Sequence, residues 1–138
     1  MLDYLKKENF CVLVTASKTA KPEAAIVCFV VKSDFSVLLF TDPRSRKAKN
    51  LRENKKASIV IGDVDKEIEI QMDGEIRILG EGKAQEAKKF ILKRHPDWLS
   101  HMDKRSVIFL HFRPIWLQYC NHAKEPCHEI LELKDFQK

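Results

Sequence analysis

Strict alternation of apolar and polar residues over Ile68–Ile78 is the clearest pattern in this chain. The positions of one parity are apolar and those of the other are charged or amide-bearing, with Gly74 in phase on the apolar side. A period of two residues over this length predicts a long β-strand with one face buried. Gly74 favours a bend or bulge within that strand.

Shorter apolar runs predict the other strands. The run Ala24–Val31 is apolar on both faces, which predicts a central strand covered by the core on one side and by a partner subunit on the other. Pro114 is expected to separate two strands, because proline donates no hydrogen bond to a ladder. Besides Ile68–Ile78, the full set of expected strands is Phe10–Ser17, Glu23–Lys32, Val37–Thr41, Ala57–Gly62, Ser106–Arg113, Ile115–Cys120 and His128–Leu133.

Helical spacing appears in three places. Residues 2–9 predict a short helix that turns Leu2 and Leu5 inward, and Ser45 is the expected N-cap of a helix that runs through about Glu53. A third helix is expected over Lys83–Arg94 and stops before Pro96. Because helices and strands do not alternate regularly, the pattern favours a mostly β fold, a closed or nearly closed barrel with peripheral helices, as a single domain over residues 1–138.

Composition limits where in the cell the protein is expected to lie. No stretch approaches the roughly 18–20 apolar residues of a membrane helix, so no membrane role is expected. Asp3 and Glu8 interrupt what would be the basic part of a signal peptide. We therefore predict a cytoplasmic protein, in which Cys11 and Cys28 are reduced and serve as small buried hydrophobic residues.

Positive charge is concentrated in one segment. Arg44–Lys56 holds seven Lys and Arg residues against Glu53 alone, a net of +6, whereas the whole chain carries only +5. The remaining residues therefore sum to −1. A local excess of this kind points to a binding site for an anion more than to a generally basic surface.

The segment Phe40–Asn50, FTDPRSRKAKN, combines this charge with a helix start. A helix N-terminus offers unpaired N–H groups and a partial positive charge. Thr41 and Ser45 add hydroxyls, Arg46 a planar guanidinium and Lys47 an ammonium group. This strand–turn–helix corner suits a phosphate, and the alternative is a solvated basic helix face.

The order of residues here resembles the pyridoxamine 5′-phosphate oxidase-like, FMN-binding split-barrel superfamily. Phe40-Thr41 is followed by Ser45-Arg46-Lys47-Ala48 and then by the run Asn50–Asn54. Further along, Gln71–Glu75 resembles a Gln-x-x-Gly strand of these proteins, and Phe112–Trp116 resembles their late Pro-x-Trp strand. The resemblance extends from about Phe10 to Tyr119.

This resemblance implies a six-stranded split β-barrel that forms a homodimer with FMN at the subunit interface. Thr41, Ser45, Arg46 and Lys47 would hold the FMN phosphate, and Phe40 would be a further cofactor-binding position. Gln71 would bind the polar edge of the isoalloxazine ring, which backbone groups of Val27–Val31 would line. Trp116 would pack near the cofactor, or alternatively serve as a core or interface aromatic residue.

The resemblance also implies an FMN-dependent oxidoreductase acting on an unknown small substrate, with no catalytic residue identified. True oxidases of this group carry an Arg and a Lys on the strand before the aromatic-Thr pair, and Ala25–Val31 has neither. Their C-terminal Arg-x-His motif is also absent from the sequence. The chain is therefore not expected to be a genuine pyridoxamine-phosphate oxidase.

Three alternatives remain open from the sequence. Cys120, His122, Cys127 and His128 are residue types that bind zinc, although their spacing matches no common zinc motif. Haem binding, as in the haem-utilisation branch of the same superfamily, is a second alternative, and a non-catalytic FMN-binding module is a third. Nucleic-acid binding is disfavoured, because no aromatic residue lies between Arg44 and Lys56 to stack on bases.

Overall fold

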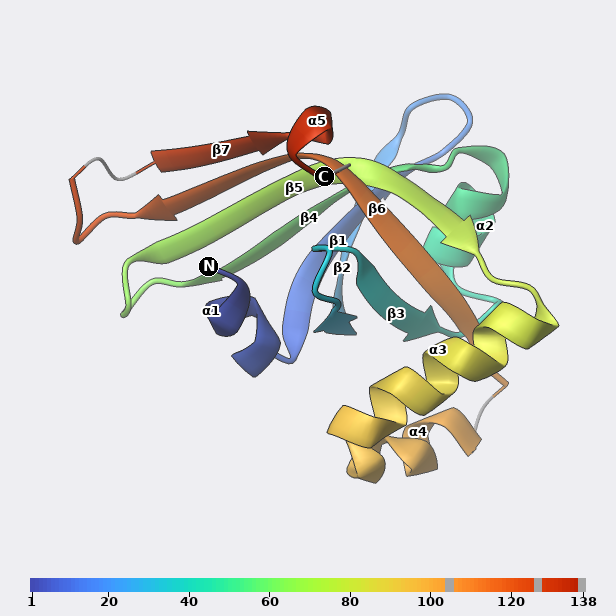
Figure 1. Cartoon of the computed structure of the whole chain (residues 1–138). Helices are drawn as coiled ribbons and strands as arrows, with labels where there is room; N and C mark the ends of the chain where they lie inside the picture. The colour runs from blue at the N-terminus through green and yellow to red at the C-terminus, as the bar shows by residue number, and fades with distance from the viewer. Residues whose placement is uncertain (104–105, 126–127, 137–138) are drawn as a thin grey trace.

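The computed structural model of the chain describes residues 1–103, 106–125 and 128–136. Seven strands and several short helices follow one another along the chain (Figure 1). The elements are α1 (Leu2–Lys7), β1 (Phe10–Ala16), β2 (Pro22–Val31), β3 (Val37–Thr41), α2 (Arg46–Glu53), β4 (Lys56–Asp63), β5 (Ile68–Ile78), α3 (Glu81–Arg94), a 3-10 turn (Pro96–Trp98), α4 (Leu99–Asp103), β6 (Ile108–Asn121), β7 (His128–Glu132) and α5 (Leu133–Phe136).

The strands form one antiparallel sheet that closes on itself. Their order is β3-β2-β1-β4-β5-β6-β7, and β3 also pairs with β6. The six strands β1–β6 thereby make a closed barrel, and β7 lies outside it along β6 (Figure 1). The predicted mostly β, six-stranded barrel with peripheral helices is confirmed.

The barrel interior is filled by the inward residues of each strand, as the alternating pattern predicts. Ile70, Met72 and Ile76 of β5 are at most 2% exposed, and Gly74 between them is buried as well. The pairing of β5 with β6 shifts register between Asp73 and Gly74, so the predicted bulge is confirmed.

The prediction that Pro114 separates two strands is wrong, because β6 continues through it from Ile108 to Asn121. The β3 ladder ends at Phe112, and the β7 ladder begins only at Trp116. Pro114 therefore lies where β6 has a ladder on one side only, opposite the bulge at Gly74. Edge positions and bulges are the places where a sheet tolerates proline.

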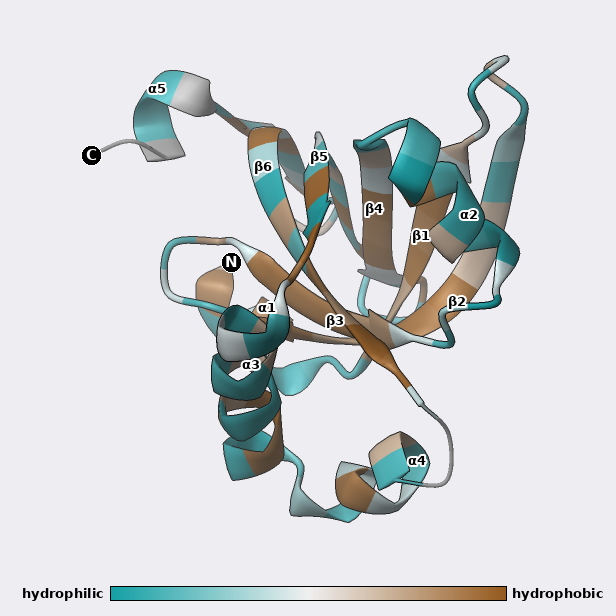
Figure 2. Cartoon of the chain, turned by 90° about the vertical axis from the view of Figure 1, so that its right-hand side faces the viewer, coloured by the Kyte–Doolittle hydropathy of each residue, from teal (hydrophilic) through white to brown (hydrophobic). Residues whose placement is uncertain are grey.

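Two sets of helices cover different parts of the barrel. The helix α1 buries Leu5 against the barrel core, as predicted, and α2 lies beside β1 and β2 (Figure 2). The helices α3 and α4 pack on the outer face of the sheet around a second apolar cluster that includes Val30, Ile91 and Trp98. In the described part of the chain, no helix is long and apolar enough to cross a membrane.

Candidate functional site

The predicted anion corner forms where β3 ends and α2 begins. Ser45 is the N-cap of α2, and its side-chain oxygen accepts a hydrogen bond from the Ala48 N–H at 3.3 Å. The turn before it is closed by the Ser45 N–H, which donates to the Asp42 carbonyl at 3.1 Å. Arg52 reaches back from the helix and donates to the Pro43 carbonyl at 2.9 Å. The start of α2 is therefore held in one conformation.

Two hydroxyl groups meet at this corner. Thr41 is only 7% exposed, and its Oγ1 lies 3.4 Å from Ser45 Oγ. The N–H groups of Arg46 and Lys47 open the helix, where no preceding turn supplies a carbonyl acceptor. Among the described residues neither N–H has a hydrogen-bond partner. The corner thus offers two backbone donors and two hydroxyls to an anion.

An acidic residue that the sequence did not reveal also lies at the corner. Glu23 Oε2 is 3.3 Å from Arg46 Nε, and the Glu23 side chain is only 13% exposed. The same oxygen accepts a hydrogen bond from Asn50 Nδ2 at 3.3 Å, and Asn50 also donates to Thr15 Oγ1 at 3.1 Å. Glu23 therefore partly neutralises the corner and holds the Arg46 guanidinium at its edge.

The other cationic side chains of the corner differ in whether they form ion pairs. Arg44 forms a two-pronged contact with Asp42, at 3.1 Å from Nε and 2.9 Å from Nη2. Lys47 is half-buried and forms no ion pair with any described residue. Of the four cations in this segment, Lys47 and Lys49 form no ion pair with any residue that the structure describes, and the Arg46 side chain, although paired with Glu23, is 75% exposed. The positive charge at the corner is available to an anion.

An open stretch of sheet edge adjoins the corner. The strand β2 pairs with β3 only over Phe29–Val31, and the β1 ladder occupies its other edge from Pro22 to Cys28. The register, with Phe29 opposite Leu39, would set Val27 opposite Thr41, but the two strands have separated there. The β2 backbone from Ala24 to Cys28 therefore faces the corner without a ladder partner on that side.

Phe40 lies on the other face of β3 from Thr41, because successive strand residues point to opposite sides. Its ring centroid is 5.9 Å from that of Trp98 and 6.3 Å from that of Phe109. These contacts place Phe40 in the apolar cluster under α3 and α4. The Phe40 ring therefore packs in this apolar cluster and does not lie beside Ser45 at the corner.

Gln71 and Trp116 lie together on the outer face of the barrel. Gln71 pairs with Gln118, and Trp116 pairs with Asp73, which makes Gln71 and Trp116 diagonal neighbours on β5 and β6. Both are half-buried, and the Gln71 amide donates to the Glu69 carboxylate. On β6 the position opposite Gln71 is Gln118, ten residues along the strand from Ile108, the position opposite Thr41.

Within one chain, the two ends of the predicted site are thus separate. Thr41, Ser45, Arg46 and Lys47 gather at the corner, whereas Gln71 and Trp116 occupy another surface. Gln71 lies in a row of directly paired outward residues that crosses six strands. The row is Ile26, Val12, Val60, Gln71, Gln118 and Ile130, and we call it the outer row. Its apolar members are 36–75% exposed.

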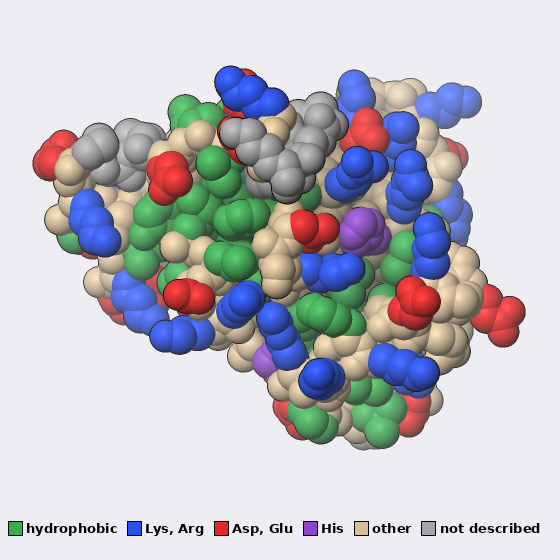
Figure 3. Space-filling view, viewed as in Figure 1, with side chains coloured by type: hydrophobic (Ala, Val, Ile, Leu, Met, Phe, Trp, Pro, Cys, Tyr) green, Lys and Arg blue, Asp and Glu red, His purple; other side chains and the backbone are tan. Residues whose placement is uncertain are grey.

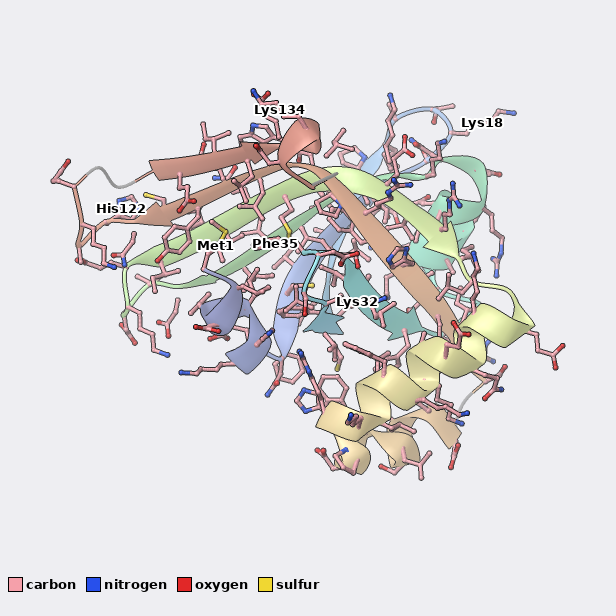
Figure 4. The ribbon with its side chains drawn as sticks, in the orientation of Figure 1. Met1, Lys18, Lys32, Phe35, His122 and Lys134 are labelled. Atoms are coloured by element: carbon pink, nitrogen blue, oxygen red, sulfur yellow. The ribbon has the colours of Figure 1, made fainter. Side chains whose placement is uncertain are left out.

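The C-terminal Cys and His residues are described only in part. Cys120 is buried, and its Sγ lies 3.5 Å from His122 Nε2 and 3.6 Å from Nδ1. Cys127 and the side chain of His128 lie outside the described residues. His122 follows β6 at the opposite end of the molecule from α2 (Figure 4). No group of three metal-binding side chains occurs among the residues that the structure describes.

Comparison with known proteins identifies the family. A family model described as pyridoxamine 5′-phosphate oxidase matches residues 1–121, and the chain belongs to this family. It is 34% identical over 77 residues to a pyridoxine/pyridoxamine 5′-phosphate oxidase of Ehrlichia ruminantium, which covers 56% of this chain and 40% of that protein. The corresponding protein of Wolbachia pipientis is 32% identical over 69 residues, 50% of this chain and 32% of its own length. The matched region is therefore less than half of either relative.

Solved structures share the fold at low sequence identity. A protein from Clostridium acetobutylicum related to general stress protein 26 superimposes with a TM-score of 0.73 at 17% identity, over 97% of this chain and 92% of that one. An FMN-binding, oxidase-related protein from Nostoc punctiforme gives 0.68 at 14%, over 88% and 79%. A haem-binding protein from Mycobacterium smegmatis gives 0.74 at 13%, over 93% and 54%. At these identities the likeness shows the fold alone.

Proposed function

We propose that this protein binds FMN with its phosphate at the corner formed by Thr41, Ser45, Arg46 and Lys47. The observation that carries the proposal is the pair of hydroxyls, 3.4 Å apart, beside two unpaired N–H groups at the start of α2. These donors match a tetrahedral dianion, and the Arg46 and Lys47 charges lie next to them. Family membership and the FMN-binding relative from Nostoc punctiforme support the choice of FMN.

The open edge of β2 adjoins this corner, and we propose that the rest of the cofactor lies along it. Ala24–Cys28 pair with β1 on one edge, and on the other edge, beside Thr41, their backbone N–H and C=O groups have no ladder partner among the described residues. Further along, the Val31 carbonyl is occupied, since it accepts a hydrogen bond from Arg94 Nη1 at 3.0 Å. Phe29–Val31 are paired with β3, so the open edge that we propose for the flavin ends at Cys28 and overlaps the expected range Val27–Val31 only at Val27 and Cys28.

Gln71 and Trp116 fit the ring end of the cofactor only if two chains associate. They lie on the outer face, away from the corner of their own chain, and the exposed apolar residues of the outer row continue from Gln71 across β4, β1 and β2. We propose a homodimer in which these faces pack together. Each FMN would then contact the corner of one subunit and the Gln71 face of its partner.

FMN, when bound, supplies hydride or electron transfer, and the chain's residues bind and orient it. On this basis we propose an FMN-dependent oxidoreductase that acts on a small molecule. The strand segment Ala25–Val31 has no Arg or Lys, and no Arg-x-His motif occurs in the sequence. A true pyridoxamine-phosphate oxidase activity is therefore not part of the proposal.

The test is FMN binding by the double variant Arg46→Ala, Lys47→Ala. Each charged contact with a phosphate contributes about 1.5–3 kcal/mol, so the two substitutions should weaken FMN binding about a hundredfold or more. Both side chains are at least partly exposed, and the circular dichroism spectrum should not change. Fluorescence quenching of FMN on titration measures the affinity.

A matched control removes the same charge elsewhere. Lys89→Ala with Lys93→Ala deletes two exposed cations of α3, and FMN affinity should stay within about twofold of the wild type. Unchanged affinity in the Arg46, Lys47 variant would show that the phosphate binds elsewhere. A haem Soret band without any FMN binding would instead favour the function named for the Mycobacterium smegmatis relative.

A further inference from the structure

A second concave site lies on the outer face of the barrel, between α3 and the β2–β3 hairpin. Its volume is about 560 Å³, and it is bordered by β5 and β6 on the sheet side. Figure 3 shows Lys and Arg side chains gathered around a histidine over β5 and β6. Leu38 faces this cleft and Thr41 faces the corner, and the odd spacing puts them on opposite faces of β3. The cleft is therefore separate from the proposed FMN site.

Four cationic side chains from four different segments line the cleft. They are Lys32 of the hairpin, Arg77 of β5, Lys83 of α3 and Arg113 of β6. In the described ranges, none of the four takes part in an ion pair. Figure 4 marks Lys32 beside β3, on the side of the barrel that faces α3. Cations that the fold brings together without partners create a positive potential in a concave site.

The acidic groups of the cleft are mostly engaged. Asp34 Oδ1 accepts hydrogen bonds from the backbone N–H of Ser36 at 2.9 Å and from its hydroxyl at 2.6 Å. Glu75 is paired with Lys55 at 3.5 Å. Neither Asp34 nor Glu86 forms an ion pair among the described residues. The four cations therefore face two carboxylates that are not ion-paired, and the cleft keeps an excess of positive charge.

His111 lies at the centre of the cations. The register aligns Leu38, His111 and Arg77 as neighbours on β3, β6 and β5. Burial lowers the pKa of His111, and so do Lys32, Arg113 and Arg77, whereas Asp34 opposes them. The imidazole is therefore neutral at pH 7, which allows one ring nitrogen to donate and the other to accept.

One wall of the cleft is apolar and flat. Leu38 and Ala87 are buried there, and the centroid of the Phe90 ring is 5.8 Å from Lys32 Nζ and 5.4 Å from Arg94 Cζ. Arg94 is fixed by its hydrogen bond to the Val31 carbonyl. We propose that this cleft binds a small organic anion in which a phosphate or carboxylate group is joined to a flat apolar body. The acid group contacts Arg77 and Arg113, and the flat body packs on Phe90.

The experiment uses the full chain with phenyl phosphate as the probe, followed by calorimetry and by the NMR signals of the His111 ring. Phenyl phosphate should bind at least tenfold more tightly than inorganic phosphate, because only the former contacts Phe90. Its negative charge should raise the pKa of His111. A silent His111 signal, or equal binding of the two phosphates, would overturn the proposal.

Two pairs of variants locate the site. Arg77→Gln with Arg113→Gln alters exposed side chains and should weaken phenyl phosphate at least tenfold, whereas Lys89→Gln with Lys93→Gln should leave it within about twofold. Unchanged affinity in the Arg77, Arg113 variant would refute the assignment. The Arg46→Ala, Lys47→Ala variant should still shift the His111 signals, so failure of the FMN site and failure of this cleft are told apart.

Discussion

A close contact with β6, and not an unusual backbone angle, requires glycine at position 74. A Cβ atom at this position would lie 2.2 Å from the Arg113 carbonyl oxygen and 2.8 Å from Phe112 Cζ. The carbonyl belongs to the β6 backbone beside Pro114, so it has little freedom to move away. The close approach of β5 and β6 at the bulge therefore requires glycine.

We expect Gly74→Ala to lower the free energy of unfolding by about 1–3 kcal/mol, because the added methyl group must displace the β6 backbone. Gly82 in the first turn of α3 is the matched control, since a Cβ there meets no atom within 4 Å. Gly82→Ala should raise stability by about 0.4–1 kcal/mol. Urea denaturation of both variants measures the difference, and equal stabilities would contradict the steric argument.

At the level of single residues, the sequence indicated the hydrogen-bond donors and cations of the corner but not the side chains that contact them. Thr41, Ser45, Arg46 and Lys47 are close in the chain, so local charge and capping rules find them. The contact between Glu23 and Asn50 became visible only in the structure, because it joins residues 27 positions apart. Neither residue carries a periodic pattern that predicts such a pair.

At the level of elements, α2 combines two roles that one substitution separates. Ser45 caps the helix through its side-chain oxygen, and the same residue borders the proposed phosphate site. Aspartate is as good an N-cap as serine and its charge suits the helix dipole, but it repels a phosphate. Alanine removes the cap and adds no charge.

We therefore expect Ser45→Asp to keep the wild-type stability within about 0.5 kcal/mol while weakening FMN binding at least tenfold. Ser45→Ala should lose about 1 kcal/mol of stability and weaken FMN binding less than Ser45→Asp does. Thermal denaturation and FMN titration of the two variants are compared. If Ser45→Asp bound FMN as tightly as the wild type, the phosphate would not lie at this helix start.

Secondary structure follows the local patterns except that β6 continues through Pro114 and that the 3-10 turn, α4 and α5 were not predicted. The alternating residues of β5, the bulge at Gly74 and the Ser45 cap are all consequences of short-range rules. Short-range rules do not predict that β6 continues through Pro114. Whether a strand tolerates proline depends on which other strands pair with it at that position. Here β3 has already ended and β7 has not begun, so the missing N–H lies at a gap between ladders.

At the level of the whole molecule, the outer row is the surface through which we propose that two chains associate. Ile26 is 75% exposed and sits beside Val12, which in turn pairs with Val60 on the next strand. Aliphatic side chains in direct cross-strand contact form a continuous apolar surface, and surfaces of this kind mark interfaces between proteins. Gln71 and Gln118 continue the row with amides that a cofactor ring can use.

We expect the wild-type protein to sediment as a dimer and Ile26→Glu to sediment as a monomer, because two carboxylates would face each other's apolar surface at a two-fold interface. FMN binding should weaken together with the loss of the dimer, since the Gln71 face of the partner is then missing. Val64→Glu is the matched control, for Val64 is 92% exposed between β4 and β5 and lies outside the outer row. It should remain a dimer and keep its affinity for FMN. A monomeric wild type would refute the shared site, whereas a monomeric Ile26→Glu with intact FMN affinity would show that one chain holds the whole cofactor.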